Sequence, residues 1–193
     1  MADQMSSDGV NYGPLAALIG TWRGDRGVDR APEPDGEERN PYYETIVFEA
    51  AGDVTNAEQQ TLSVVRYHQE VRRKSNDKVF HDQVGYWLWD PADDTIVETF
   101  TIPRGVAVVA GGKMGQPADL SQELVFAVAA DASSPQFGIV QAPFMFKQAK
   151  TTAFSHTIKV LGDEMRYTES TILDIYDKTA YDHKDVNTLR RVG

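Results

Sequence analysis

Short segments rich in valine, isoleucine, threonine and aromatic residues run through almost the whole chain, separated by tight polar turns such as KSND (74–77), DPADD (90–94) and LGDE (161–164). Such turns join neighbouring antiparallel strands. Ten strands are predicted, at 21–24, 42–50, 61–72, 79–90, 95–102, 105–111, 123–129, 154–161, 165–176 and 185–192. Because no long helical segment interrupts them, the pattern predicts an all-β barrel or sandwich.

The alternation within the strands favours a barrel. In 62–71 one face carries Leu62, Val64, Arg66, His68 and Glu70, and neither face is purely apolar. A sandwich packs two apolar inner faces, whereas a barrel that holds a ligand or water tolerates a mixed interior. We therefore predict a ten-stranded antiparallel up-and-down barrel as a single domain over 12–193, preceded by a flexible tail over 1–11.

The amino-terminal stretch GPLAALIGTWRG (13–24) predicts how one end of the barrel closes. Pro14 suits the first position of a short helical cap that Gly20 ends. Trp22 would then lie beside the last strand, where Arg190 and Arg191 could stack on the indole and bind free helix carbonyls. The charged segment 28–40, with its prolines and glycine, is predicted to be a solvated loop. A short helical or irregular piece is expected at 143–150.

Charge and composition exclude several classes of function. The net charge of −10 argues against nucleic-acid and anionic-membrane partners, which need clustered positive charge. The absence of cysteine excludes disulfides and thiolate chemistry. The first ten residues lack a secretory signal pattern, and no apolar run approaches the ~20 residues of a membrane span, so a cytoplasmic protein is expected. A homodimer is compatible with these features.

Eight side chains are candidates to line the barrel interior. His81, Gln83 and Trp87 share one face of their strand, where polar groups would orient a ligand. An internal arginine would bind a carboxylate at two points. The alternative places Arg66 and Arg166 outside, paired with Glu70 or Glu169. The full set is Tyr43, Thr45, Arg66, His68, His81, Gln83, Trp87 and Arg166.

Several of these segments, taken in order, resemble the nitrobindin-like family, the THAP4-type haem-binding β-barrel of the calycin superfamily, which also includes lipocalins and fatty-acid-binding proteins. The resembling pieces are PLAALIGTWRG (14–24), YYETIVFEA (42–50), VFHDQVGYW (79–87), VETFTIPRGVAVVAGG (97–112), YTESTIL (167–173) and LRRV (189–192). The resemblance implies a ten-stranded barrel with an apolar pocket, a histidine-bound haem b, and chemistry with nitric oxide or peroxynitrite.

The chain departs from that family at the iron ligand. The family's histidine stands five residues before the position of Leu189, which here is Lys184. His183 is one position away, and a one-residue slip turns a strand side chain to the opposite face. His183 is therefore expected to point away from the cavity unless a bulge restores the register. His183 stays the candidate haem ligand, with His81 as the fallback.

Two functional hypotheses remain open. The first is the binding of a small, mostly apolar molecule inside the barrel, with no required cofactor. The second is a haem b protein that binds nitric oxide or isomerises peroxynitrite to nitrate. Because hydrolase motifs such as G-x-S-x-G and H-E-x-x-H are absent from the sequence, binding is favoured over catalysis.

Overall fold

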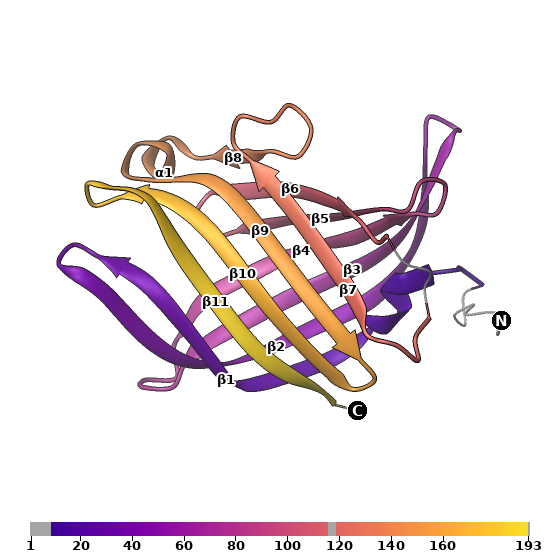
Figure 1. The fold of residues 1–193 in the computed structure, drawn as a ribbon, viewed down its shortest axis with the longest axis horizontal. Helices are drawn as coiled ribbons and strands as arrows, with labels where there is room; N and C mark the ends of the chain where they lie inside the picture. The colour runs from indigo at the N-terminus through magenta and orange to yellow at the C-terminus, as the bar shows by residue number, and fades with distance from the viewer. Residues whose placement is uncertain (1–8, 116–118, 193) are drawn as a thin grey trace.

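A closed antiparallel barrel forms the body of the protein in the computed structural model, which describes residues 9–115 and 119–192 (Figure 1). Ten strands hydrogen-bond in a ring, in which β5 pairs with both β4 and β6, and the short β8 adds to the edge of β6. The strands are β1 (Gly20–Glu33), β2 (Gly36–Asn56), β3 (Gln60–Arg73), β4 (Val79–Asp90), β5 (Thr95–Ile102), β6 (Val106–Lys113), β7 (Leu124–Asp131), β8 (Ile139–Gln141), β9 (Ala149–Leu161), β10 (Glu164–Ile175) and β11 (Lys178–Val192). The predicted all-β fold with a ten-stranded antiparallel barrel is confirmed.

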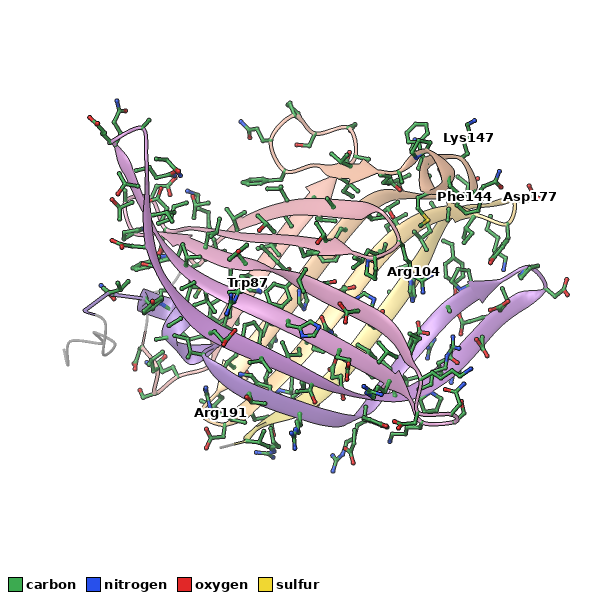
Figure 2. All side chains as sticks on the ribbon, turned by 180° about the vertical axis from the view of Figure 1, so that it is seen from behind. Trp87, Arg104, Phe144, Lys147, Asp177 and Arg191 are labelled. Atoms are coloured by element: carbon green, nitrogen blue, oxygen red, sulfur yellow. The ribbon has the colours of Figure 1, made fainter. Side chains whose placement is uncertain are left out.

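The two ends of the barrel differ. A 3₁₀ turn, η1 (Gly13–Ala17), takes the place of the predicted helical cap. The opposite end carries α1 (Pro143–Gln148), within the segment where a helical or irregular piece was predicted. Figure 2 shows Arg104, Phe144 and Lys147 toward this α1 end and Arg191 toward the η1 end. Neither helical element is long and apolar enough to cross a membrane.

Trp22 and Arg191 join the first and last strands at the η1 end. The Trp22 side chain is fully buried, and its Nε1 donates to the Leu18 carbonyl at 2.7 Å. The guanidinium of Arg191 lies 4.2 Å from the centroid of the Trp22 ring and donates to the carbonyls of Ala17 and Ile19. Arg190 projects outward to Glu164 instead.

The predicted loop over 28–40 is wrong. All of these residues except 34–35, which form the turn, belong to β1 and β2, and the two strands pair from Gly20↔Phe48 to Glu33↔Gly36 as one long hairpin. Because the two strands pair without interruption from Gly27↔Tyr42 to Glu33↔Gly36, ladder hydrogen bonds outweigh the poor strand propensity of the charged residues and prolines. The predicted tail over 1–11 falls mainly on residues 1–8, which lie outside the described residues.

Side chains alternate between the inner and outer faces along each strand, and the inward-facing ones fill the interior of the barrel. Apolar side chains dominate the η1 half, where Leu15, Leu18, Phe126 and Met165 are almost completely buried. The same inward face also carries a set of buried polar side chains. Buried polar groups are normally hydrogen-bonded, so the partners of these side chains identify the polar clusters inside the barrel where a ligand could be bound.

Candidate functional site

Glu44 on β2 is the centre of one buried polar cluster. Its carboxylate accepts hydrogen bonds from Gln69 (2.9 Å), Tyr167 (3.0 Å) and Asn187 (2.8 Å), which lie on three other strands. The Tyr42 hydroxyl lies 2.7 Å from that of Tyr167. Burial raises the pKa of Glu44 to about 7, because desolvation outweighs the three donors.

Glu98 on β5 is the centre of a second buried cluster. The amide of Gln83 donates to the Tyr67 hydroxyl at 2.6 Å, and that hydroxyl donates to Glu98 at 2.7 Å. His81 Nε2 lies 3.2 Å from Gln83 Oε1, which can only accept, so Nε2 carries the proton. On the other side, His156 Nδ1 lies 2.9 Å from Glu98. Glu98 is therefore the common acceptor of a hydrogen-bonded chain that crosses the barrel.

His156 is held as a buried cation by this chain. Burial by itself would lower its pKa, but the charge of Glu98 and the hydrogen bond to it raise the pKa to about 8. Its second nitrogen, Nε2, is buried and has no hydrogen-bond partner among the described residues. Trp87 Nε1 is likewise buried without a hydrogen-bond partner among the described residues, and the centroids of the Trp87 and His156 rings are 6.1 Å apart. Two buried N–H donors thus lack acceptors in one part of the interior.

A row of carboxylates runs across three neighbouring strands toward the α1 end. Asp29 on β1 pairs in register with Asp185 on β11, which pairs with Glu169 on β10. Burial first, and then the charge of Glu169, raises the pKa of Asp185 to about 8. His183 reaches into this row, with its Nε2 2.6 Å from Asp29 Oδ1 and 3.6 Å from Asp185 Oδ2.

The orientation of His183 corrects the expectation that it points away from the cavity. His183 lies on the same face of β11 as Asp185, Asn187 and Leu189, of which Leu189 is fully buried. Lys184 is the residue that points outward, with its ammonium 2.8 Å from Asp182. Pairing of β11 with β10 is regular from Tyr181 to Arg190, so alternation alone sets this orientation.

Three of the eight predicted cavity residues face the interior and five do not. His81, Gln83 and Trp87 point inward. The five that the structure places on the outer surface are Tyr43, Thr45, Arg66, His68 and Arg166. Arg66 pairs with Glu49 at 2.8 Å and Arg166 with Glu123 at 2.5 Å, both exposed. Inward and outward faces carry similar residue types in these strands, so composition could not separate them.

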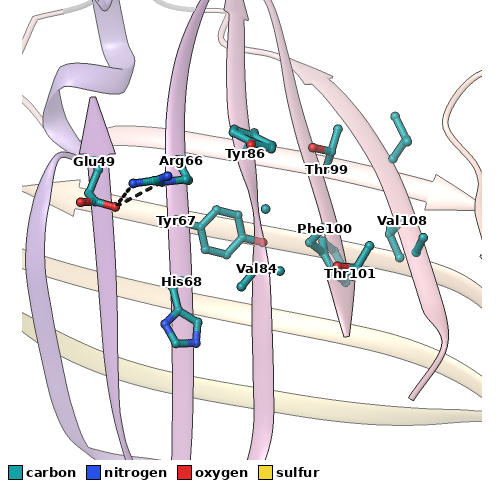
Figure 3. Close-up of a pocket in the computed structure, with 13 residues that line it drawn as sticks. Glu49, Arg66, Tyr67, His68, Val84, Tyr86, Thr99, Phe100, Thr101 and Val108 are labelled. Atoms are coloured by element: carbon teal, nitrogen blue, oxygen red, sulfur yellow. Dashed lines mark hydrogen bonds and ion pairs between the residues drawn. The ribbon is translucent and has the colours of Figure 1, made fainter. Parts of the chain in front are cut away.

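A hollow of about 600 Å³ lies on this outer surface, across β2 to β6 (Figure 3). Arg66, His68 and Tyr86 border it, and its floor is formed by Tyr67 and Phe100. His68 is also 3.0 Å from Asp82. The hollow has no buried charged group of its own, because Glu49 and Arg66 are both more than half exposed. The chemistry of the chain therefore concentrates inside the barrel.

Sequence reasoning missed the interior acids. Glu44 shares a face with Ile46 and Phe48, and Glu98 shares one with Ile96 and Phe100. A carboxylate in phase with apolar residues on a strand is the signal that could have found both. His156 carried the same signal beside Phe154 and Ile158, but its partner Glu98 lies on a distant strand.

A family model described as a THAP4-like, heme-binding beta-barrel domain matches residues 11–191. The chain belongs to this family. The crystal structure of Rv2717c from M. tuberculosis is similar in fold, with a TM-score of 0.68 and 21% sequence identity over 93% of this chain and 95% of that chain.

The histidines of this member of the heme-binding beta-barrel family do not fit a haem. Histidine reaches a haem iron through Nε2, since Nδ1 lies next to Cγ, where the bond to Cβ crowds the approach of a porphyrin. All four histidines lie in the described part of the chain. Nε2 of His81 bonds to Gln83, Nε2 of His156 carries a proton because Glu98 favours the imidazolium, and His68 is outside.

His183, the family's nearest counterpart to a ligand, fits least. Its Nε2 is bound to Asp29. Burial alone would lower its pKa, but that hydrogen bond and the charges of Asp185 and Asp29 raise it, which favours the imidazolium form. The carboxylates of Asp29 and Asp185 that flank this imidazole oppose the apolar face of a porphyrin. No step is therefore assigned to haem in this chain.

Proposed function

We propose that this barrel binds a small, uncharged and mostly apolar molecule in its interior, with a carbonyl or similar acceptor group directed at His156 and Trp87. The observation that supports it is the pair of buried N–H groups without acceptors. Leaving a buried donor unsatisfied costs about 1–3 kcal/mol, so an acceptor atom from a ligand would gain that energy.

The electrostatics of the interior favour an uncharged ligand over a fatty acid. Glu44, Glu98 and Glu169 face the same interior, and a ligand carboxylate would be repelled there. The guanidinium groups that the sequence offered for capture of a carboxylate, Arg66 and Arg166, lie outside. Rings of Phe100, Phe126 and Phe154 supply the apolar surface for the remainder of such a molecule.

Nile red, a neutral dye with one carbonyl acceptor, tests the proposal. The dye should bind saturably with enhanced emission and quench tryptophan fluorescence. Trp87→Phe removes one unpaired donor and should weaken binding about tenfold. Trp89→Phe is the matched control, because Trp89 Nε1 already donates to Asp94 at 3.1 Å. Equal affinity of the wild type and Trp87→Phe, or no saturable binding, would refute the proposed site.

Haem b is the competing candidate, supported by the family match. It would bring the nitric-oxide or peroxynitrite chemistry with it, whereas the proposed binding protein has no catalytic activity. Hemin added to the purified protein should leave the Soret band at the position of free hemin. A shifted Soret band that His183→Ala or His81→Ala abolishes would replace the small-molecule proposal with haem binding. The homodimer stays a prediction.

A further inference from the structure

Asp29, His183 and Asp185 bring one imidazole nitrogen and two carboxylates together on two neighbouring strands. Their potential ligand atoms all lie within 4.8 Å of one another. We propose that this triad, on the inner wall of the barrel toward the α1 end, binds a divalent first-row transition metal ion such as Zn²⁺. The site is distinct from the His156–Trp87 region of the proposed function and does not depend on it.

The spacing of the three side chains suits a common metal ion. Ligand atoms at about 2.0–2.2 Å from Zn²⁺ are themselves about 3–3.5 Å apart. His183 Nε2 lies 2.6 Å from Asp29 Oδ1 and 3.6 Å from Asp185 Oδ2, on either side of that range. Side-chain rotations that move these atoms by about half an ångström, together with loss of the imidazole proton, would convert the hydrogen-bonded triad into a set of metal ligands.

A neighbouring side chain, Asn40, orients one carboxylate of the triad. Asn40 Nδ2 donates to Asp29 Oδ2 at 3.1 Å, which fixes the carboxylate and leaves Oδ1 turned toward His183. Such hydrogen bonds to ligating carboxylates are the usual outer support of metal sites. Asp29 is only 4% exposed, so its orientation is further held by packing.

A third carboxylate, that of Glu169, lies beside the triad and favours the binding of a cation there. Glu169 stands directly opposite Asp185 in the β10–β11 pairing and makes no hydrogen bond or ion pair among the described residues. Like charges directly opposed across strands are destabilising, and here three carboxylates follow one another across three strands. The single positive charge of His183 offsets only part of this repulsion. A divalent cation in place of the imidazole proton would offset more of it, and Glu169 would be available as a fourth ligand. His183 and Asp185 are both about a quarter exposed, so a hydrated ion can reach them.

The mixed donor set decides the class of metal. One imidazole with carboxylates suits Zn²⁺, Co²⁺ and Mn²⁺, whereas Mg²⁺ and Ca²⁺ prefer oxygen ligands alone. By the usual order of affinity, Zn²⁺ should bind more tightly than Mn²⁺. The absence of cysteine leaves no competing thiolate site in the chain.

The test is titration of the chelator-treated full chain with Co²⁺, followed by visible absorption, and with Zn²⁺, followed by calorimetry. One ion per chain should bind, and Zn²⁺ should raise the unfolding temperature. His183→Ala and Asp185→Asn should each weaken binding at least about tenfold, and Asn40→Ala, which only frees Asp29, by about tenfold. Circular dichroism establishes that each variant is folded, and Asp185→Asn, which keeps the size of the side chain, stands in if His183→Ala does not fold.

The matched control is His68→Ala. His68 and Asp82 form a His–carboxylate pair of similar length, 3.0 Å, on the outer surface. Its removal should leave the binding of Zn²⁺ and Co²⁺ unchanged. The proposal is overturned if no 1:1 binding occurs, if folded His183→Ala and Asp185→Asn bind like the wild type, or if Ca²⁺ binds as tightly as Zn²⁺.

Discussion

The imidazole of His156 on β9 meets the carboxylate of Glu98 on β5 across the barrel, with Nδ1 2.9 Å from Oε2. The two strands are not neighbours in the sheet, because β6 and β7 separate them. The contact therefore ties together, through the interior, two strands that lie three positions apart in the ring. Both side chains are almost fully removed from solvent, at 8% and 0% exposure, so neither charge has water as a substitute partner.

Glu98→Gln should destabilise the fold by about 3 kcal/mol, because it leaves the buried imidazolium of His156 without its counter-charge. Urea unfolding at pH 6 measures the change. Glu49→Gln is the control on the outer wall, where the partner Arg66 is 59% exposed, and it should change stability by less than about 1 kcal/mol. Equal effects of the two substitutions would contradict a buried ion pair.

Stability should fall as pH rises from about 5 to about 8.5. The folded-state pKa of His156, about 8, lies above its ordinary value of 6.5, so its contribution is complete below pH 6.5 and is lost as pH rises through about 8. The pKa of Glu44 is raised from 4.5 to about 7, so the folded state keeps a proton that the unfolded state loses, and stability falls between about pH 4.5 and 7. Asp185, with its pKa raised from 3.8 to about 8, acts in the same direction.

Urea unfolding at several pH values, with NMR titration of the His156 ring, tests this pH dependence. In Glu98→Gln the slope above pH 6.5 should become shallower, with the part due to Asp185 remaining, while the slope below pH 6.5 persists, because Glu98 raises the pKa of His156 and not those of Glu44 or Asp185. A stability that rises with pH over this range would contradict these assignments.

Arg191→Ala should cost about 2 kcal/mol of stability, because it removes the stack on Trp22 and the hydrogen bonds to the Ala17 and Ile19 carbonyls. Thermal or urea unfolding measures it. Arg190→Ala is the neighbouring control. Its side chain is 69% exposed and should change stability by less than about 1 kcal/mol. A larger loss for Arg190→Ala would argue against the closure at Trp22.

Tyr67→Phe should destabilise the protein by about 2 kcal/mol, because Glu98 loses a donor and the Gln83 amide loses its acceptor. Tyr86→Phe on the adjacent strand removes an exposed hydroxyl and should be nearly neutral. Urea unfolding of the two variants side by side distinguishes a buried hydrogen-bonded chain from general sensitivity of the sheet.

The sequence alone determined the barrel, its antiparallel order and the family, because these depend on strand propensity, turn spacing and ordered motifs. Trp22 and Arg191 could likewise be placed together, since they lie in the first and last strands, but Arg190 was wrongly placed with them, because it points outward to Glu164. The long pairing of β1 and β2 could not be predicted, because the charges and prolines of 28–40 mask a strand that only its partner stabilises.

Only the tertiary structure decided which side chains enter the barrel. In β1 the pairing shifts between Gly24 and Gly27, so Trp22 and Asp29 both point inward although simple alternation would separate them. The shift brings Asp29 to the inner face, beside His183, and Glu98 meets His156 although 58 residues separate them. Alternation is local, whereas register shifts and contacts across the interior arise only when the ring of strands closes.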